Sequence, residues 1–96
     1  MRAEESGYNY ERGRKLETVN VGFGNVVSKD KIVCVLNSDS QPIKRLIQEA
    51  RDRGFLLDAT FGRKTRSVIV TDSNHIILSS LVVETISNRV ETERKG

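Results

Sequence analysis

Three cationic side chains lie within one short segment of the chain. Arg63, Lys64 and Arg66 follow Gly62, and no acidic residue lies between them. A guanidinium can form two parallel hydrogen bonds with a phosphate or a guanine edge, whereas an ammonium binds phosphate as a point charge. The segment therefore predicts a contact site for nucleic acid. From this motif alone, a solvated turn with incidental charges is the alternative.

The charge of the surrounding sequence agrees with the nucleic-acid interpretation. Residues 41–66 contain seven basic and three acidic residues, a net charge of +4 in a chain whose net charge is +3. Such a local excess is expected of a surface that binds nucleic acid. Some cations of the predicted helix can instead pair with Glu49 or Asp52. These helix cations are Lys44, Arg45, Arg51 and Arg53.

Side chains that could support catalysis or hold a metal are sparse. Cys34 is the only cysteine and His75 the only histidine, whereas a nucleophile needs a base and zinc usually takes four Cys or His ligands. We expect Cys34 in the core and His75 near the surface. Gly22 and Gly24 lack the third glycine of a dinucleotide-binding loop, since Val27 occupies its position. We therefore expect a protein that is not an enzyme and that binds no metal, no cofactor and no small-molecule substrate.

Length and hydropathy limit the class of protein. A chain of 96 residues suits one domain with a modest core, which contacts from a partner subunit can extend. No apolar run approaches the roughly 18 residues that a membrane span needs. The N-terminal segment has no apolar stretch of the signal-peptide type. We expect a cytoplasmic protein with no membrane association.

The elements that must position the basic segment predict an α+β fold. We expect a small antiparallel β-sheet of about five strands, one main amphipathic helix and a short C-terminal helix over residues 84–90. The main helix, residues 41–53, has a cap at Asp39 or Ser40, and Gly54 suits its end. Pro42 lies in its first turn. An apolar stripe recurs at helical spacing along it: Ile43, Leu46, Ile47 and Ala50.

The strands are expected to form hairpins around the basic segment. The β-branched run over residues 32–36 indicates a central strand buried on both faces. Short loops between the later strands predict antiparallel pairs, with Arg63 and Lys64 at a hairpin tip. The first expected strand covers residues 18–21 and resumes over 26–28 after a glycine-containing turn. The other expected strands cover residues 32–36, 55–60, 66–71 and 75–80.

The chain divides into an arm, one domain and a tail. Residues 1–17 are expected to form a flexible N-terminal arm, 18–90 a single domain and 91–96 a charged tail.

Exposed aromatic rings would suit single-stranded RNA, which stacks its bases on them. Phe23 and Phe61 lie near turns, but we expect both to pack in the core.

Several blocks of the sequence, taken in order, resemble the RemA family of bacterial regulators of extracellular matrix (biofilm) genes. The resemblance extends from Val19 to Val90. It rests on residues 20–25, 39–45, 58–60, 62–66, 71–73 and 75–79.

The resemblance implies function as well as fold. It implies a fold similar to LytTR-type DNA-binding domains and a homo-oligomeric ring, such as an octamer, on which double-stranded DNA wraps. The basic DNA-contacting positions of the family fall on Lys31, Arg63 and Lys64, to which the charge pattern adds Arg66. Lys31 and Lys64 stand where the family commonly has Arg. Lys keeps the positive charge at these positions but loses the guanidinium fork. A DNA-binding transcriptional regulator is therefore expected, with an RNA-binding module or a non-catalytic structural oligomer as the alternatives.

Overall fold

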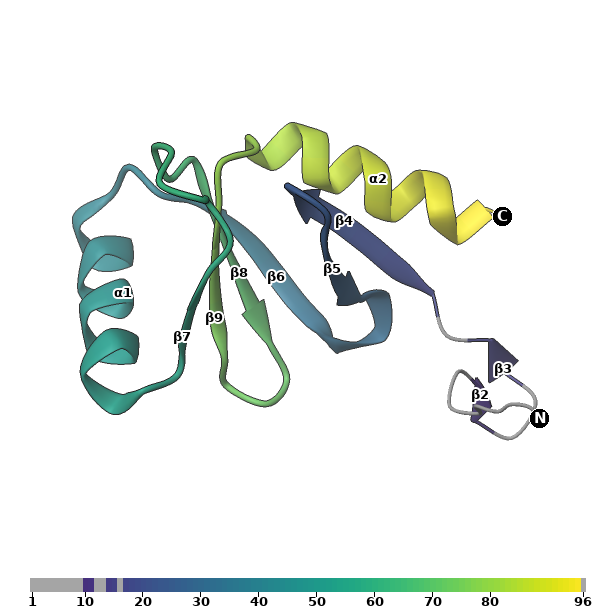
Figure 1. The fold of residues 1–96 in the computed structure, drawn as a ribbon, viewed down its shortest axis with the longest axis horizontal. Coiled ribbons are helices and arrows are strands. Elements are labelled where there is room, and N and C mark those ends of the chain that lie inside the picture. Colours follow the sequence, from purple (N-terminus) through teal and green to yellow (C-terminus); the bar gives the residue numbers. More distant parts are fainter. Residues whose placement is uncertain (1–9, 12–13, 16, 96) are drawn as a thin grey trace.

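The structure is a computed structural model that describes residues 10–11, 14–15 and 17–95, with side chains described for residues 17–91. Most of the arm expected over residues 1–17 lies outside the described residues. The part that is described includes a short antiparallel pair, β2 (Tyr10–Glu11) and β3 (Arg14–Lys15). An α+β fold is confirmed, with the helices and strands arranged in layers (Figure 1).

A four-stranded sheet forms the middle layer, and a separate two-stranded hairpin lies beside it (Figure 1). β8 lies in the sheet interior and is antiparallel to both of its neighbours. The strand order of the sheet is β6 (Ile32–Asn37), β8 (Ser67–Thr71), β9 (Ile76–Ser79) and β7 (Leu56–Asp58). The hairpin joins β4 (Thr18–Gly22) to β5 (Asn25–Ser28).

The expectation that the strands on either side of the basic segment pair as a hairpin is wrong. β7 pairs in parallel with β9, so residues 59–66 cross over β9 to reach β8 instead of turning back between paired neighbours. The tight turn at Asp72–Asn74 does form the expected hairpin, which joins β8 to β9. In this hairpin, β9 pairs with the edge of β8 that β7 was expected to pair with. The basic segment therefore lies on a crossover loop at one end of the sheet.

The expectation of a central strand at residues 32–36 is also wrong. β6 is an edge strand, and Val33 is 62% exposed. The register shifts between Ile32 and Cys34, as in a β-bulge, so the alternation of side chains is interrupted there. Cys34 is partly buried rather than part of the core. The buried interior strands are β8 and β9, whose apolar residues are fewer but face packed layers on both sides.

Helix α1 (Gln41–Arg53) covers one face of the sheet and confirms its expected signals. The Ser40 hydroxyl accepts a hydrogen bond from the N–H of Ile43 at 3.4 Å, and Gly54 ends the helix at φ +81°. The apolar stripe packs on alternate residues of the strands. This cluster contains Ala50, Val68, Ile76 and Leu78, with Ile43, Leu46 and Ile47 against it.

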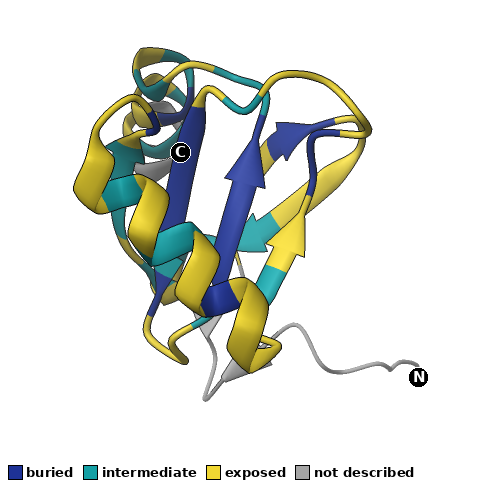
Figure 2. Ribbon diagram, turned by 90° about the vertical axis from the view of Figure 1, so that its left-hand side faces the viewer, coloured by how far each residue is buried: buried dark blue, intermediate teal, exposed yellow. Residues whose placement is uncertain are grey.

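The other face is covered by the β4–β5 hairpin and by α2 (Val83–Lys95) (Figure 1). Ile69 and Ile77 point to this side and meet Val19, Val21 and Ile86. Figure 2 shows the buried strands behind the exposed outer surface of α1. α2 extends beyond the short helix expected at residues 84–90 and continues to Lys95, through most of the segment expected to be a tail.

Buried serines join the sheet to its covering layer. Ser67 and Ser79 are paired in register and fully buried. The Ser79 hydroxyl donates to the carbonyl of Val21 at 2.7 Å, and the Ser67 hydroxyl donates to the carbonyl of Leu81 at 2.7 Å. Because a buried hydroxyl without a partner costs about 1–3 kcal/mol, these bonds fix how the hairpin and α2 lie on this end of the sheet.

Candidate nucleic-acid interface

The crossover loop begins with a tight, hydrogen-bonded turn. The Asp58 carboxylate accepts from the N–H of Thr60 at 2.9 Å and from its hydroxyl at 2.6 Å. The hydrogen bond from the Thr60 hydroxyl, and then the one from its N–H, lower the pKa of Asp58 from its ordinary 3.8. Burial opposes this lowering of the pKa, and the positive charge of Arg51 adds to it. The N–H of Arg63 then donates to the carbonyl of Thr60 at 3.0 Å, which closes a four-residue turn.

The second half of the loop is held by its neighbours while its cations face solvent. The Ser38 hydroxyl donates to the carbonyl of Thr65 at 2.9 Å, and the N–H of Arg66 donates to the carbonyl of Ser79 at 2.8 Å. Arg63, Lys64 and Arg66 are all exposed, and none forms an ion pair with a residue in the described part of the chain. The structure thus brings three of the four expected contact residues together on a fixed backbone.

Lys31, the fourth expected contact residue, lies at the opposite end of the sheet. It ends the short 3₁₀ turn η2 (Lys29–Lys31), and its carbonyl accepts from the N–H of Asp72 at 2.9 Å. β6 and β8 pair from Ile32 with Thr71 to Asn37 with Ser67, which separates the two ends by about 17 Å at 3.3 Å per residue. The Lys31 side chain is 62% exposed, and its ammonium lies 3.8 Å from the carboxylate of Asp72.

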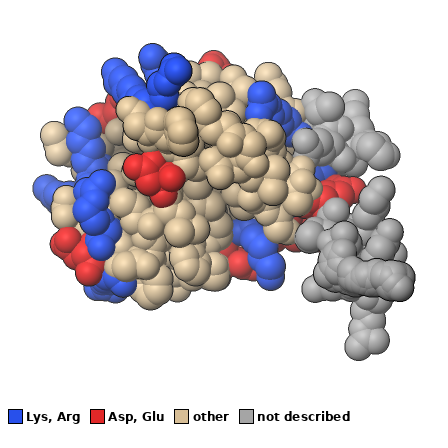
Figure 3. All heavy atoms as spheres, viewed as in Figure 1, with Lys and Arg blue, Asp and Glu red and all other residues tan. Residues whose placement is uncertain are grey.

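Lys44 and Arg45, the helix cations near the start of α1, extend the positive surface around the crossover loop. Ser38 bonds the loop just before α1 begins, so the first turn of α1 with Lys44 and Arg45 lies at the loop end of the sheet. Figure 3 shows Lys and Arg side chains along the α1 side and the upper margin of one face. Arg51 bonds the side-chain oxygen of Gln48 at 3.4 Å rather than pairing with Glu49 or Asp52. Asp39 and Glu84 add acid beside Lys64, where they line the same shallow hollow.

An exposed aromatic pair borders the basic loop, and the expectation that these rings pack in the core is wrong. Phe23 is 50% exposed and Phe61 is 80% exposed. Their ring centroids lie 5.3 Å apart at an interplanar angle of 31°, and the guanidinium of Arg63 lies 5.7 Å from the Phe23 centroid. The sequence signal was the Phe-Gly dipeptide, because a two-residue turn at the apex of a loop leaves no core for its first side chain to enter.

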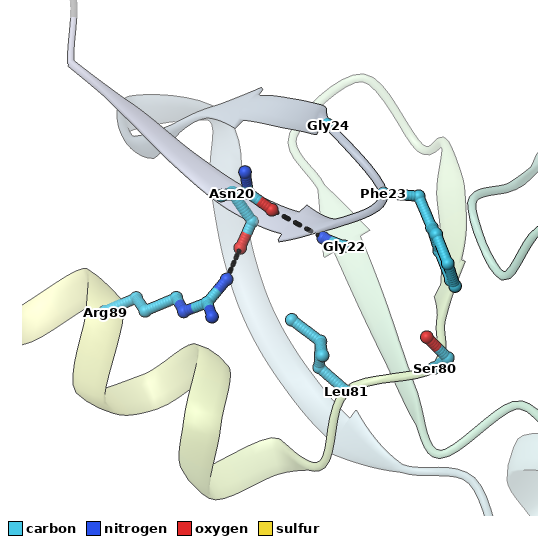
Figure 4. A pocket seen from close by; sticks show the side chains of 7 residues that line it. All are labelled: Asn20, Gly22, Phe23, Gly24, Ser80, Leu81 and Arg89. Carbon is cyan, nitrogen blue, oxygen red and sulfur yellow. Dashed lines mark hydrogen bonds between the residues drawn. The ribbon is translucent and has the colours of Figure 1, made fainter.

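An open hollow of about 550 Å³ lies beside Phe23 (Figure 4). Arg89 reaches it from α2 and donates to the carbonyl of Asn20 at 2.9 Å. The Asn20 side chain accepts from the N–H of Gly22 at 2.7 Å, which holds the turn that carries Phe23. The hollow is lined by one cation and no carboxylate: Asn20, Gly22, Phe23, Gly24, Ser80, Leu81 and Arg89. Sequence reasoning gave no role to Arg89, which comes from a distant part of the chain.

The two residues best suited to nucleophilic or acid–base chemistry lie on different elements. Cys34 lies in β6, while His75 follows the β8–β9 turn, where its Nδ1 is 2.8 Å from the Ser73 hydroxyl and its ring meets the edge of Phe55. Residues 17–91 hold no group of three or more His, Cys, Asp or Glu side chains that could bind a metal ion. None of the described helices is long and apolar enough to cross a membrane.

Comparison with known proteins places the chain in a family. A family model described as RemA-like, extracellular matrix regulatory protein A-like, matches residues 18–90. The chain belongs to the RemA-like family. This match covers all of the loop cations, Lys31, the Phe23–Phe61 pair and Arg89.

Relatives of this RemA-like protein occur in clostridia. A Clostridium acetobutylicum protein is 53% identical over 81 residues, which are 84% of this chain and 88% of the relative. A Clostridium botulinum protein is 54% identical over 78 residues, 81% of this chain and 88% of the relative. A Clostridium perfringens protein is 52% identical over 80 residues, 83% of this chain and 90% of the relative. Each is named "Putative regulatory protein".

Proposed function

We propose that this RemA-like protein is an oligomeric, DNA-binding transcriptional regulator of extracellular matrix genes in the bacterial cytoplasm. The observation that carries the proposal is the crossover loop, where Arg63, Lys64 and Arg66 are exposed on a pinned backbone without an acidic partner among the described residues. Such a loop loses little conformational entropy when it meets a phosphate, and its cations displace the counterions that surround the duplex.

The division of labour within the loop follows from side-chain chemistry. Arg63 can contact phosphate with two parallel hydrogen bonds, whereas Lys64 contributes a point charge. Lys31 supplies a further phosphate contact from the other end of the sheet. With few direct base contacts available, sequence preference would come from the shape and flexibility of the DNA.

A single subunit offers too few contacts for tight binding, which is why we include assembly in the proposal. A ring-like homo-oligomer such as an octamer would add the contacts of its copies along one bent duplex. In a head-to-tail ring, the loop end of one copy can lie beside the Lys31 end of the next, which would join two basic sites that lie apart within one chain. The exposed apolar residues Val33 and Leu57, on the two edge strands, suit contacts between copies.

The proposed activity is binding rather than catalysis, without a cofactor or a small-molecule substrate. Cys34 and His75 are separated between elements, and the names of the relatives describe regulation. Regulation by DNA binding needs no reacting side chain. It needs exposed cations that contact phosphates, and the crossover loop carries such cations.

The deciding experiment is fluorescence anisotropy of a labelled AT-rich duplex of about 40 base pairs across a salt series. We expect tight binding at low salt and a slope of about 0.9 per neutralised phosphate in log affinity against log salt. The double variant Arg63→Ala/Lys64→Ala should flatten this slope. Absence of duplex binding at low salt would overturn the proposal and favour a purely structural oligomer.

One observation supports RNA as a second candidate. Exposed rings such as Phe61 and Phe23 provide surfaces on which unpaired bases stack. In a competition assay with the same anisotropy readout, a clear preference for single-stranded RNA over duplex DNA would favour an RNA-binding module.

A further inference from the structure

Two phenylalanine-glycine turns from distant parts of the chain meet at one corner of the molecule. In the β4–β5 hairpin, Phe23 and Gly24 have φ of +53° and +78°. In the crossover loop, Phe61 and Gly62 have φ of +54° and +83°. Positive φ at both central residues is the signature of a type I′ turn, in which Asn, Asp or Gly normally fills the first position. The chain places a bulky ring at that unfavourable position twice.

The backbone strain does not serve the core. Phe61 is 80% exposed, so its ring contributes little to burial, and the ring that it contacts belongs to Phe23, which also has a positive φ. A strained residue persists only where the surrounding structure holds it, and here Asp58, Thr60 and Ser38 hold the loop from both sides. The fold alone gives no reason for an aromatic residue at position 61, which points to a role outside the core.

The charge around the pair indicates which partner it meets. Arg63 lies over Phe23, and Arg89 lies across the adjoining hollow, whose lining contains no carboxylate. Figure 4 shows Phe23, Leu81 and Arg89 bordering this space from a strand turn, a loop and a helix. Arginine and aromatic residues are common at protein interfaces as well, so the pair of arginines alone does not identify the partner. DNA is favoured because an apolar side chain that enters a duplex is flanked by cations that meet the phosphates, and the hollow beside Phe23 holds a cation without a carboxylate.

We propose that Phe61, braced by Phe23, is a wedge that inserts at a base step of bound duplex DNA, with Arg63 and Arg89 meeting the flanking phosphates. This rests on the proposed function, because it assigns the feature that bends the DNA bound by the loop cations. An apolar side chain that enters between base pairs unstacks them and kinks the duplex. Pyrimidine–purine steps such as TA unstack most easily, so the wedge would prefer them to stiff A-tracts.

The test measures bending separately from binding. Duplexes of about 40 base pairs, labelled at both ends for energy transfer, carry either a central TA step or an uninterrupted A-tract. The variant Phe61→Asn keeps a residue that suits the turn and removes the ring, whereas Phe61→Leu keeps an apolar wedge. Phe55→Asn is the matched control, because Phe55 is also exposed but contacts His75 at the opposite end of the sheet.

We expect Phe61→Asn to lose the increase in energy transfer and the preference for TA, with the salt slope and the oligomer mass unchanged. Phe61→Leu should retain most of both effects, and Phe55→Asn should match the parent. Unchanged bending by Phe61→Asn would overturn the wedge while leaving the proposed function intact. A fall in oligomer mass measured by light scattering would also overturn it and make the pair a subunit contact. A parent that binds no duplex at low salt would overturn both proposals.

Discussion

The two ends of the four-stranded sheet are built on different principles. At the end that carries the β8–β9 turn, Asn74 takes the positive φ of +69°, a residue type that tolerates it. Two lysines at this end have acidic partners, since Lys29 bonds Glu17 at 2.6 Å and Lys31 lies near Asp72. At the other end, phenylalanines take the positive φ, and the cations of the crossover loop have no acidic partner among the described residues.

The difference between the two ends distinguishes residues that folding requires from residues that serve another role. Local sequence preference and tertiary structure agree at the turn end, as expected where only stability matters. At the loop end they conflict, because a bulky residue at positive φ costs on the order of 1–2 kcal/mol. Such conflicts gather at functional sites. The comparison therefore favours the loop end as the principal surface for a partner.

The largest expected effect tests the two ends against each other in DNA binding. Arg63→Ala/Lys64→Ala removes two charge-assisted contacts of about 1.5 kcal/mol each, or roughly 100-fold in affinity. Lys31→Ala removes one contact from a cation that Asp72 already offsets, so we expect a loss of tenfold or less, on the order of one weak contact. Anisotropy measures both, with Arg53→Ala as the control for net charge. Equal losses for the two ends would contradict the ranking.

A smaller effect concerns the strain itself. Phe61→Asn should relieve about 1–2 kcal/mol of backbone strain and lose about 0.5 kcal/mol of ring contact, a net gain in unfolding free energy near 1 kcal/mol. The reciprocal change at the other end, Asn74→Phe, should destabilise by a similar amount because it introduces the same strain. Urea unfolding of both variants measures these values. A loss of stability in Phe61→Asn would show that the ring supports the fold.

The smallest effect is the pH dependence from the turn that begins the loop. Hydrogen bonds from Thr60 lower the pKa of Asp58 in the folded state, so this carboxylate stabilises the protein above its ordinary value of 3.8. The contribution is lost as the pH falls through the lowered folded pKa. The Tm advantage of the parent over Asp58→Asn should therefore be full near neutral pH and shrink below about pH 4. A difference that stays constant down to acidic pH would contradict this role.

Local signals in the sequence were sufficient for much of the fold. The α1 helix follows from its Ser40 cap, its apolar stripe and Gly54, and all three are present in the structure. The β8–β9 hairpin follows from the Asp72–Asn74 turn. The basic character of residues 63–66 was likewise readable, because charge and exposure in a glycine-containing loop depend on few neighbours.

Other features depended on contacts between distant segments, and there the sequence misled. A continuous apolar run made β6 look central, although it is an edge strand with a bulge. The sequence favours a hairpin at residues 59–66, where the structure has a crossover, because a short loop does not reveal which strand occupies the neighbouring edge. The sequence favours buried positions for Phe23 and Phe61, since aromatic residues are usually buried, but both are exposed.

The sequence by itself thus determined the helices, the turns, the cationic segment and the family resemblance. These are encoded by residue type at short spacing, where backbone propensity and capping act independently of the rest of the chain. Only the tertiary structure decided which end of the sheet holds Lys31 and which holds Arg63, and that two phenylalanines meet beside the loop. Strand order and side-chain exposure are set by the non-local burial of apolar surface, which no local pattern specifies.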